Sequence, residues 1–484
     1  MTQHINQRYN IRKTFFPEEN TMRKPRIGLL PLYVELYDIA EPECRPTINA
    51  AHKNTSDKLK NAGLEVVDVP VCRLAREFED AIKTFEDANC DCIVTLHLAY
   101  SPSLQSEKAL AKTKLPIIIL DTTPDFTYDH TTSPDLLMYN HGIHGVQDMC
   151  NLLIRNGKKF SIFAGHLEKS NVISRVFAAA KAAMIAAELR SSRVGLVGGA
   201  FEGMGDFQLP LEEFKADLGI ETVLYDFEKG AKRIAEVTEE DIQKEKAEDL
   251  KNFIFDPSLS EETYRNTAPV SLALRRWVEE EKLTAFSVNF LATDNPGLTT
   301  MPFTECCKAM TRGTGYAGEG DVLTAALTGA VLSAYEDATF TEMFCPDWEH
   351  GTVYLSHMGE FNYLSSDKKP TMYEKPFPYT AAKNPTVAFA TLKGGRALYI
   401  NLAPFGNGNY TLTIAPGEML SIDGENTQSE SVNGWFKPDV SLETFLERFS
   451  AVGATHHSVL VYGDELETFA ALGNILGVKT EIIR

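Results

Sequence analysis

Four short apolar runs, separated by amphipathic stretches, mark the first part of the chain. The runs are RIGLLPLY from Arg26, EVVDVPV from Glu65, DCIVTLHL from Asp91 and PIIILD from Pro116. The segments between them, such as 49–62 and 72–85, carry apolar residues at helical spacing. Buried strands that alternate with helices are typical of a parallel sheet with crossover helices. The pattern predicts a doubly wound α/β domain over residues 26–158, after a mobile N-terminal tail of residues 1–25.

A second series of the same kind follows. It begins with KFSIFAG at 159–165, continues with an Ala-rich helix at 170–189, and has further apolar runs at 193–199, 222–227 and 284–290. These segments predict a second doubly wound α/β domain over residues 159–345. The charged stretch 237–253, with Glu and Lys at i,i+4 spacing, is predicted to be a solvated helix face without a functional role.

The pattern changes beyond Cys345. Apolar and polar positions alternate with a period of two in TVYLSHMGEF, TVAFATL, ALYINLA, YTLTIAPGEML and HSVLVYG, with Gly, Pro and Asn between the runs. This pattern is typical of antiparallel strands joined by tight turns. We therefore expect two doubly wound α/β domains followed by a mostly antiparallel β domain over residues 346–484, which ends in a helix near 464–476.

Length and charge narrow the range of functions. The chain has 484 residues and a formal net charge of −20, from 47 Lys and Arg against 67 Asp and Glu, with no basic block. This balance opposes binding to nucleic acid or to an anionic membrane surface. No apolar run approaches the ~20 residues that a bilayer-spanning helix needs, and the first 25 residues are polar rather than signal-like. A soluble, cytoplasmic protein is expected.

Neither the cysteines nor the glycine-rich stretch indicates a cofactor. The eight cysteines are dispersed and form no CxxC pair, so we expect core thiols rather than a zinc site. The stretch GLVGGAFEGMGDF at 195–207 follows a predicted strand but contains neither GxGxxG nor GxxxxGK[ST]. A flexible connection without a nucleotide cofactor is predicted there.

The residues around Glu319 carry more chemical information. Residues 315–321 place Glu319 and Asp321 among three glycines, directly before a predicted helix at 322–336. Asp321 is expected to cap that helix, whereas Glu319 has no such structural role. Downstream lie three further candidate positions, namely Glu342, His357 and the pair His456-His457. Each is more often an ordinary surface or core residue, but two carboxylates and two imidazoles together suit a divalent cation of the Mn²⁺ type.

These motifs, in this order, resemble a known family. The strings GEGDVLTAAL at 318–327, TFTEMF with Glu342, LSHMGE with His357 and GATHHSV with His456-His457 are similar to the metal-site signature of the L-arabinose isomerase family. That family lies within the arabinose/fucose isomerase-like group, in which two α/β domains precede a β-rich domain. Less specific similarities lie upstream, in HLAYSPS at 97–103 and NHGIHGVQD at 140–148.

The resemblance implies roles for individual residues. It makes Glu319, Glu342, His357 and His457 the metal ligands, with Glu319 and Glu342 also serving as the catalytic acid/base pair. His456 is then a neighbour of the site, either structural or substrate-binding. His144 matches a family histidine that reaches sugar hydroxyls from an adjacent subunit; the alternative is a helix-start histidine that the backbone satisfies.

The same resemblance implies a cofactor and an assembly. The cofactor would be Mn²⁺ or another divalent cation such as Mg²⁺ or Co²⁺, and the assembly a homo-oligomer, in the form of a hexamer, with sites completed across subunits. One departure bears on the substrate. Where the arabinose enzymes have Gly-Ser-Gln-His-Leu-Tyr, this chain has LYVELY at 32–37, so Val34 replaces a substrate-contacting Gln. A different aldose or ketose is therefore expected.

Three functions remain in competition on the sequence alone. The first is a metal-dependent isomerase that interconverts an aldose and a ketose through an enediol. The second is a metal-dependent epimerase or lyase that acts on a sugar or sugar acid, since enediol chemistry branches at the last proton transfer. The third is a non-catalytic sugar-binding protein, which leaves the two carboxylates and two imidazoles unexplained.

Overall fold

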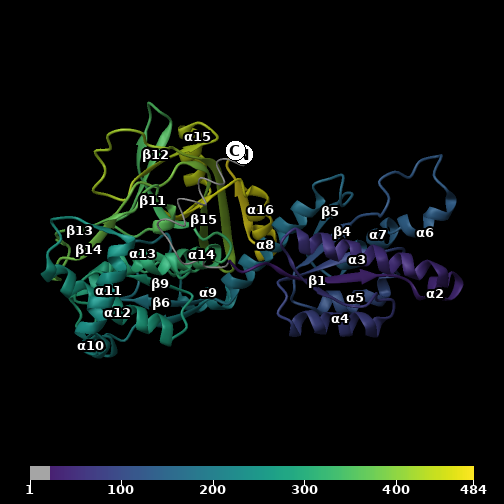
Figure 1. Cartoon of the computed structure of the whole chain (residues 1–484), viewed down its shortest axis with the longest axis horizontal. Coiled ribbons are helices and arrows are strands. Elements are labelled where there is room, and N and C mark those ends of the chain that lie inside the picture. Colours follow the sequence, from purple (N-terminus) through teal and green to yellow (C-terminus); the bar gives the residue numbers. More distant parts are fainter. Residues whose placement is uncertain (1–21) are drawn as a thin grey trace. The chain divides into compact units, whose positions relative to one another are not determined.

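The computed structural model describes residues 22–484. Backbone contacts divide this part of the chain into two units (Figure 1). The first contains Arg23–Ala187 together with Glu467–Gly477, and the second contains Glu188–Leu466 together with Val478–Arg484. Of the tail predicted over residues 1–25, residues 1–21 lie outside the described part of the chain.

The first unit contains a five-stranded parallel sheet in the order β2-β1-β3-β4-β5. Its strands are β1 (Arg26–Leu32), β2 (Glu65–Asp68), β3 (Cys92–His97), β4 (Ile117–Asp121) and β5 (Phe160–Ala164). The strand order reverses between β1 and β3, because β2 lies on one side of β1 and β3 to β5 lie on the other. In sheets of this kind, ligands bind at the carboxyl ends of the strands beside such a reversal.

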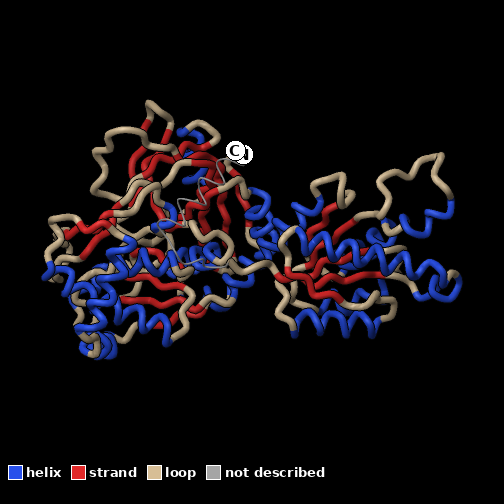
Figure 2. Tube along the Cα trace, viewed as in Figure 1, coloured by secondary structure: helices blue, strands red, loops and turns tan. Residues whose placement is uncertain are grey.

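Helices cover both faces of this sheet (Figure 2). One buried cluster joins the sheet to α3 (Arg45–Asn61) and α8 (Val172–Arg190). The cluster on the other face joins it to α4 (Ala75–Asp87), α5 (Ser103–Lys112) and α7 (Ile143–Arg155). Short helices α2 (Glu35–Ala40) and α6 (Leu137–Asn140) lie in the connections after β1 and β4. The helix predicted near the C-terminus, α16 (Leu466–Leu476), packs Ala471 and Ile475 against the α3 side.

One strand lies in a different sheet from the one predicted. The run at 159–165 was expected to open the second α/β domain, but β5 pairs in parallel with β4 and completes the first sheet. The first sheet thus extends past residue 158, and the second begins at β6 (Arg193–Val197). The pattern of apolar positions identifies a buried parallel strand but does not show which sheet it joins.

The second unit begins with a four-stranded parallel sheet in the order β10-β9-β6-β7. The other strands are β7 (Glu221–Leu224), β9 (Ala285–Val288) and β10 (Gly315–Gly318). The accompanying helices are α9 (Leu211–Leu218), α10 (Phe227–Ala235), α11 (Glu239–Asn252), α12 (Glu261–Glu280), α13 (Phe303–Thr311) and α14 (Val322–Leu332). β10 ends directly before Glu319, so the sheet delivers this carboxylate at its carboxyl edge.

The rest of the second unit is mostly antiparallel, as predicted. Six strands form a closed ring in the order β15-β18-β11-β12-β17-β16, because β15 and β16 also pair with each other. They are β11 (Thr339–Asp347), β12 (Thr352–Ser356), β15 (Gly395–Gly406), β16 (Asn409–Met419), β17 (Gly434–Pro438) and β18 (His457–Tyr462). The predicted fold class, with parallel α/β sheets followed by a mostly antiparallel β region, is confirmed.

Smaller elements complete this region. They are a three-stranded sheet of β8 (Ile254–Phe255), β13 (Thr371–Glu374) and β14 (Thr386–Phe389), the helix α15 (Leu442–Ala451), and β19 (Lys479–Ile482), which runs parallel to β16. Because β11 belongs to the ring, Glu342 lies in the β-rich part and not, as predicted, in the second α/β domain. Within residues 22–484, the structure has no helix both long and apolar enough to cross a membrane.

Candidate active site

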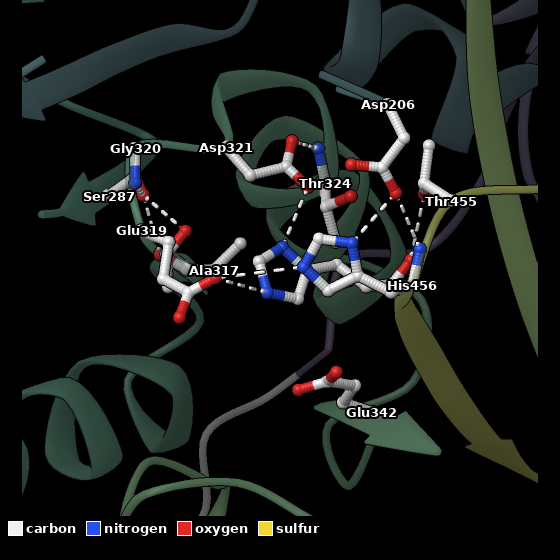
Figure 3. Close-up of polar contacts among 12 residues, drawn as sticks. Asp206, Ser287, Ala317, Glu319, Gly320, Asp321, Thr324, Glu342, Thr455 and His456 are labelled. Carbon is white, nitrogen blue, oxygen red and sulfur yellow. Dashed lines mark hydrogen bonds and ion pairs between the residues drawn. The ribbon is translucent and has the colours of Figure 1, made fainter. Parts of the chain in front are cut away.

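The loop that carries Glu319 is held in an unusual conformation. Glu319 and Gly320 both have left-handed backbones, with φ values of 65° and 86°. For a residue with a side chain this costs about 1–2 kcal/mol. Ser287 Oγ fixes the loop by donating to the Ala317 carbonyl at 2.7 Å and accepting from the Gly320 amide at 2.9 Å (Figure 3). Strain of this kind in a non-glycine residue is characteristic of functional sites.

Glycine is required at two positions beside Glu319. A Cβ on Gly318 would lie 2.9 Å from Cε1 of His357, so only glycine lets the imidazole pack against the strand. A Cβ on Gly320 would lie 2.3 Å from the Gly199 carbonyl oxygen, which belongs to the glycine-rich stretch. That stretch is therefore packed against the Glu319 loop, and the Phe201 amide donates to the Glu319 carbonyl at 2.8 Å.

Strand register brings the other predicted ligands to the same place. In the antiparallel ring, Glu342 on β11 is directly opposite His457 on β18 and Ser356 on β12. His357 follows Ser356 immediately. A shift of one residue in the register would move Glu342 to the other face of the sheet. The pairing therefore determines that a carboxylate and two imidazoles gather at one end of the ring.

The structure brings the four predicted ligands together. Nε2 of His457 lies 3.4 Å from a Glu319 carboxylate oxygen, and Nε2 of His357 lies 4.0 Å from Glu342. Two groups of three residues each have candidate ligand atoms that all lie within 4.8 Å of one another, and both groups contain His457. One consists of Glu319, His456 and His457, and the other of Glu342, His357 and His457. Figure 3 shows Glu342 on a strand that is separate from the loop that carries Glu319.

Each imidazole at this centre is oriented by its own carboxylate. The three contacts between Nδ1 and a carboxylate oxygen are His357 to Glu360 at 2.7 Å, His457 to Asp321 at 3.1 Å and His456 to Asp206 at 2.7 Å. Because Nδ1 contacts the carboxylate in each case, Nε2 is the ring nitrogen that remains available to the centre. In the described part of the chain, Nε2 of His456 and of His457 is buried without a hydrogen-bond partner. Buried polar atoms are rarely left in this state.

The charges at the centre favour a cation. Burial alone would raise the pKa of Glu319, but the imidazoles of His456 and His457 hold that pKa well below its usual range. Burial would lower the pKa of both histidines, but Asp321 and Glu319 raise the pKa of His457 to about 9, and Asp206 and Glu319 raise that of His456 to about 10. The carboxylates thus draw positive charge to this point, which a divalent cation can supply in place of the protons.

Aromatic side chains form the walls of the centre. The ring of Phe340 lies 4.8 Å from that of His357 and 5.1 Å from that of His457, and the Phe207 ring stacks on His457 at 5.5 Å. An apolar wall lowers the local dielectric, so it strengthens the interaction between the donors and a cation.

Two functional residues were not predicted. Asp206 lies in the glycine-rich stretch, where only a nucleotide motif was sought, and 250 residues separate it from His456. Glu360 stands three residues after His357 within the quoted motif, and that spacing is the one signal that could have identified it. Asp321 does cap α14, as predicted, through the Thr324 amide at 2.9 Å. Its other oxygen holds His457.

His144 belongs to the other unit. It is exposed near the start of α7, and its ring lies 4.9 Å from that of Tyr100 and 5.2 Å from that of His141. In the same unit, the side chains of Thr95, His97 and Ser101 are buried without hydrogen-bond partners among residues 22–484. Burial lowers the pKa of His97 to about 3, so this imidazole is neutral. Val34, the departure noted in the sequence, is buried directly before α2.

A parallel α/β sheet and an antiparallel β ring that meet at one carboxylate–imidazole centre define an enzyme of the arabinose/fucose isomerase-like class. Comparison with known proteins gives the particular family. The family model of the L-arabinose isomerase central domain matches residues 212–335, and that of the L-arabinose isomerase C-terminal domain matches residues 337–479. Together they cover more than half of the chain, which belongs to the L-arabinose isomerase family. The boundary between them falls between α14 and β11.

Individual relatives are similar over most of their length. L-arabinose isomerase 1 of Bacillus licheniformis is 24% identical over 422 residues, which cover 85% of this chain and 85% of the relative. L-arabinose isomerase of Clostridium beijerinckii is 23% identical over 408 residues, with 82% of each chain covered. Among solved structures, a periplasmic solute-binding protein of Actinobacillus succinogenes with bound D-allose covers 64% of this chain and 91% of its own. Its TM-score of 0.17 and 13% identity carry no argument about fold.

Proposed function

We propose that this protein is a divalent-cation-dependent enzyme that interconverts an aldose and a ketose. The observation that carries the proposal is that Glu319, Glu342, His357 and His457 fall in two groups of candidate ligands that share His457, in a chain whose relatives are L-arabinose isomerases. The loop after β10, strand β11, the end of β12 and strand β18 supply these side chains. Strand register aligns Glu342, His357 and His457, and the carboxyl edge of the parallel sheet adds Glu319.

The donor set fits a cation such as Mn²⁺, with Mg²⁺ and Co²⁺ as alternatives. Glu319, Glu342, His357 and His457 would hold it, because two carboxylates and two imidazoles combine oxygen and nitrogen ligands in a way that suits Mn²⁺. Nε2 of His457 is buried 3.4 Å from a Glu319 carboxylate oxygen and forms no hydrogen bond among the described residues, so it is available to a cation. When bound, the cation polarises the sugar carbonyl and stabilises the negative charge that develops on oxygen.

The two glutamates would transfer the protons. Conversion of an aldose to a ketose removes a proton from C2, adds one at C1, and moves another from O2 to O1. Glu319 follows β10 and Glu342 lies on β11 (Figure 3), and carboxylates from two separate segments suit a pair that acts at neighbouring carbons. A positioned carboxylate acts as general base and, once protonated, as general acid. No redox cofactor is needed because the substrate is its own oxidant and reductant.

His456 is assigned to the substrate. Its Nδ1 is tied to Asp206, while its Nε2 lies 3.6 Å from the Glu319 carboxylate and has no hydrogen-bond partner among the described residues. It is more exposed than His457. An imidazole in this position would hydrogen-bond a sugar hydroxyl beside the reacting carbons.

His144 is assigned to a sugar site that a neighbouring copy of the chain completes. Support comes from the carboxyl edge of the first sheet, where unpartnered side chains of Thr95, His97 and Ser101 lie in the same unit as His144. Large exposed apolar side chains occur in the segments that follow β1, β3 and β4; they are Leu36, Ile39, Leu104, Phe126 and Ile143. Exposed apolar clusters of this kind mark protein–protein contacts. The proposed assembly is a homo-oligomer, in the form of a hexamer.

The sugar itself is proposed to be neutral and different from arabinose. Val34 offers no hydrogen bond where the arabinose enzymes have Gln. Among the residues that the structure describes, no Lys or Arg forms an ion pair or hydrogen bond with Glu319, Glu342 or the three imidazoles. A sugar acid would be expected to need such a cation for its carboxylate. This disfavours the lyase alternative.

A substrate screen tests the proposal. The purified chain with Mn²⁺ is incubated with pentoses, hexoses and deoxysugars, and each aldose–ketose product is separated by chromatography. We expect ketose from at least one aldose other than arabinose. A metal-loaded protein that fails on every aldose and ketose, but epimerises a sugar or cleaves a sugar acid, would contradict the proposal.

A further inference from the structure

A buried chain of hydrogen bonds leads away from His357. Nδ1 of His357 contacts one oxygen of Glu360 at 2.7 Å, and the other oxygen accepts from the Tyr316 hydroxyl at 2.8 Å. Tyr316 lies in β10, three residues before Glu319. The chain therefore connects the turn that holds one predicted ligand to the strand that delivers another. All three side chains are buried.

The turn that carries Glu360 is fixed on both sides. The Gly359 carbonyl accepts from the thiol of Cys307 on α13 at 3.1 Å. The Asn362 amide donates to Thr339 Oγ1 at 2.9 Å, and the Asn362 side chain donates to the Ala338 carbonyl at 2.9 Å. Glu360 thus has little freedom to move toward or away from His357, so the orientation of the imidazole follows from the backbone of the turn.

The charge of Glu360 has no ordinary partner. Three other buried carboxylates of this unit, Glu245, Asp249 and Glu305, form ion pairs with Lys308, Arg275 or Arg312, whereas Asp321, like Glu360, contacts an imidazole. Among the described residues, Glu360 has only a hydroxyl and an imidazole. A buried carboxylate is costly without a compensating positive charge. Among the described residues, a positive charge on the Nε2 side of His357 can therefore act on the Glu360 carboxylate only through the imidazole ring.

We propose that Glu360, held by Tyr316, is a positioning residue that sets the cation affinity of the centre through His357. By accepting the Nδ1 proton, Glu360 fixes the tautomer whose Nε2 lone pair faces Glu342. Tyr316 keeps the Glu360 carboxylate in place and links it to β10. The inference rests on the proposed function, because it assigns a role toward the same cation.

The test measures Mn²⁺ affinity by calorimetry on the full chain, alongside the melting temperature. Glu360→Gln keeps the volume but removes the charge, and it is expected to weaken Mn²⁺ binding 10–100-fold. Tyr316→Phe removes one hydrogen bond and is expected to weaken binding by less, in the same direction. Once Glu360→Gln is present, Tyr316→Phe should add little, because the two residues act along one path.

A matched control separates positioning from general destabilisation. The Tyr264 hydroxyl donates to the buried carboxylate of Asp249 at 2.8 Å, the same length as the Tyr316 bond, but in the α11–α12 region. Tyr264→Phe should lower the melting temperature and leave Mn²⁺ affinity within about twofold.

Three outcomes would overturn the inference. Folded Glu360→Gln and Tyr316→Phe proteins that bind Mn²⁺ like the wild type would remove the positioning role and leave the proposed function intact. Equal weakening by Tyr264→Phe would show a general structural effect. A wild-type protein that binds no Mn²⁺, Mg²⁺ or Co²⁺ would overturn the proposed function as well.

Discussion

The chemistry of this protein depends on a few side chains with tightly defined surroundings. Glu319 has a strained backbone, and Gly318 leaves just enough space for the imidazole of His357. Neither feature stabilises the fold. Both are explained if the centre must present its oxygen and nitrogen atoms to one bound ion and its substrate, since strain persists where function requires it.

Replacing either proposed base tests this at the level of single atoms. Glu319→Gln and Glu342→Gln keep the side-chain volume and one carbonyl oxygen, but an amide cannot accept a proton near neutral pH. Turnover should fall on the order of 10²–10⁴-fold while the fold remains intact. Metal content must be measured beside the rate, because the loss of a charged ligand also weakens cation binding. A Gln variant that is active at full metal occupancy would show that its glutamate is not a base.

The histidines predict a specific pH dependence for the cation-free protein. The folded-state pKa values of His457 and His456 are raised to about 9 and about 10, against about 6.5 for an unfolded histidine. Because these values are raised, the stabilisation is fully present below about pH 6.5 and is lost as the pH rises through 9 to 10. The melting temperature with a chelator should therefore fall across this range.

Bound Mn²⁺ should flatten that decline, because it displaces the protons and binds more tightly as the pH rises. Melting curves with and without Mn²⁺, recorded from pH 6 to 10, check both statements. A chelated protein whose melting temperature is constant or rises over this range would contradict the account of the two histidines.

Asn401 shows how single elements support the centre. Its side chain lies fully buried in β15 and spans the turn before β18. The amide nitrogen donates to the carbonyls of Thr455 and His457 at 3.0 and 2.6 Å, and the amide oxygen accepts from the Thr455 backbone at 3.1 Å. One residue of a neighbouring strand thus fixes the backbone from which His456 and His457 project.

Asn401→Ala should therefore damage stability and binding together. Several buried backbone groups would lose their partner, at a cost of about 1–3 kcal/mol for each group left unsatisfied. Urea unfolding measures the first effect and a Mn²⁺ titration the second, and we expect weaker cation binding. If the unfolding midpoint falls while Mn²⁺ affinity stays at the wild-type value, the turn keeps its geometry without Asn401.

Many of the strands could be predicted from the sequence. Buried strands such as those at Arg26 and Asp91 have continuous apolar runs, and the C-terminal strands alternate with a period of two. These signals are local. The sheet that β5 joins, the return of α16 to the first unit and the closure of the ring by β15 and β16 depend on contacts between distant segments. No periodicity encodes them.

The same limit applies to the site. Glu319, Glu342, His357 and His457 could be predicted as candidates because they stand in short, ordered motifs, and in the structure their donor atoms fall in two groups that share His457. The Asp206 contact with His456 could not be foreseen, because it joins two loops 250 residues apart.

For the whole molecule, the proposed homo-oligomer can be tested by combining two defective chains. If His144 of one copy serves the Glu319 centre of another, two defective chains can complement each other. Oligomers of Glu319→Gln and of His144→Ala should each be impaired, and co-expression should restore part of the activity by forming sites with both residues intact. Co-expressed Glu319→Gln and Glu342→Gln chains serve as the control, because both defects lie in one centre. Mixed oligomers without recovery would place His144 outside the sugar site.

In the proposed function, one divalent cation per chain enables an aldose–ketose isomerisation. Titration of the metal-stripped protein with Mn²⁺, with ketose formation from its best aldose measured by chromatography, tests this dependence. We expect no turnover without the cation and a rate that rises until it saturates at one Mn²⁺ per chain. Turnover that is unaffected by chelation, or a protein saturated with Mn²⁺ that forms no ketose from any aldose, would contradict the account.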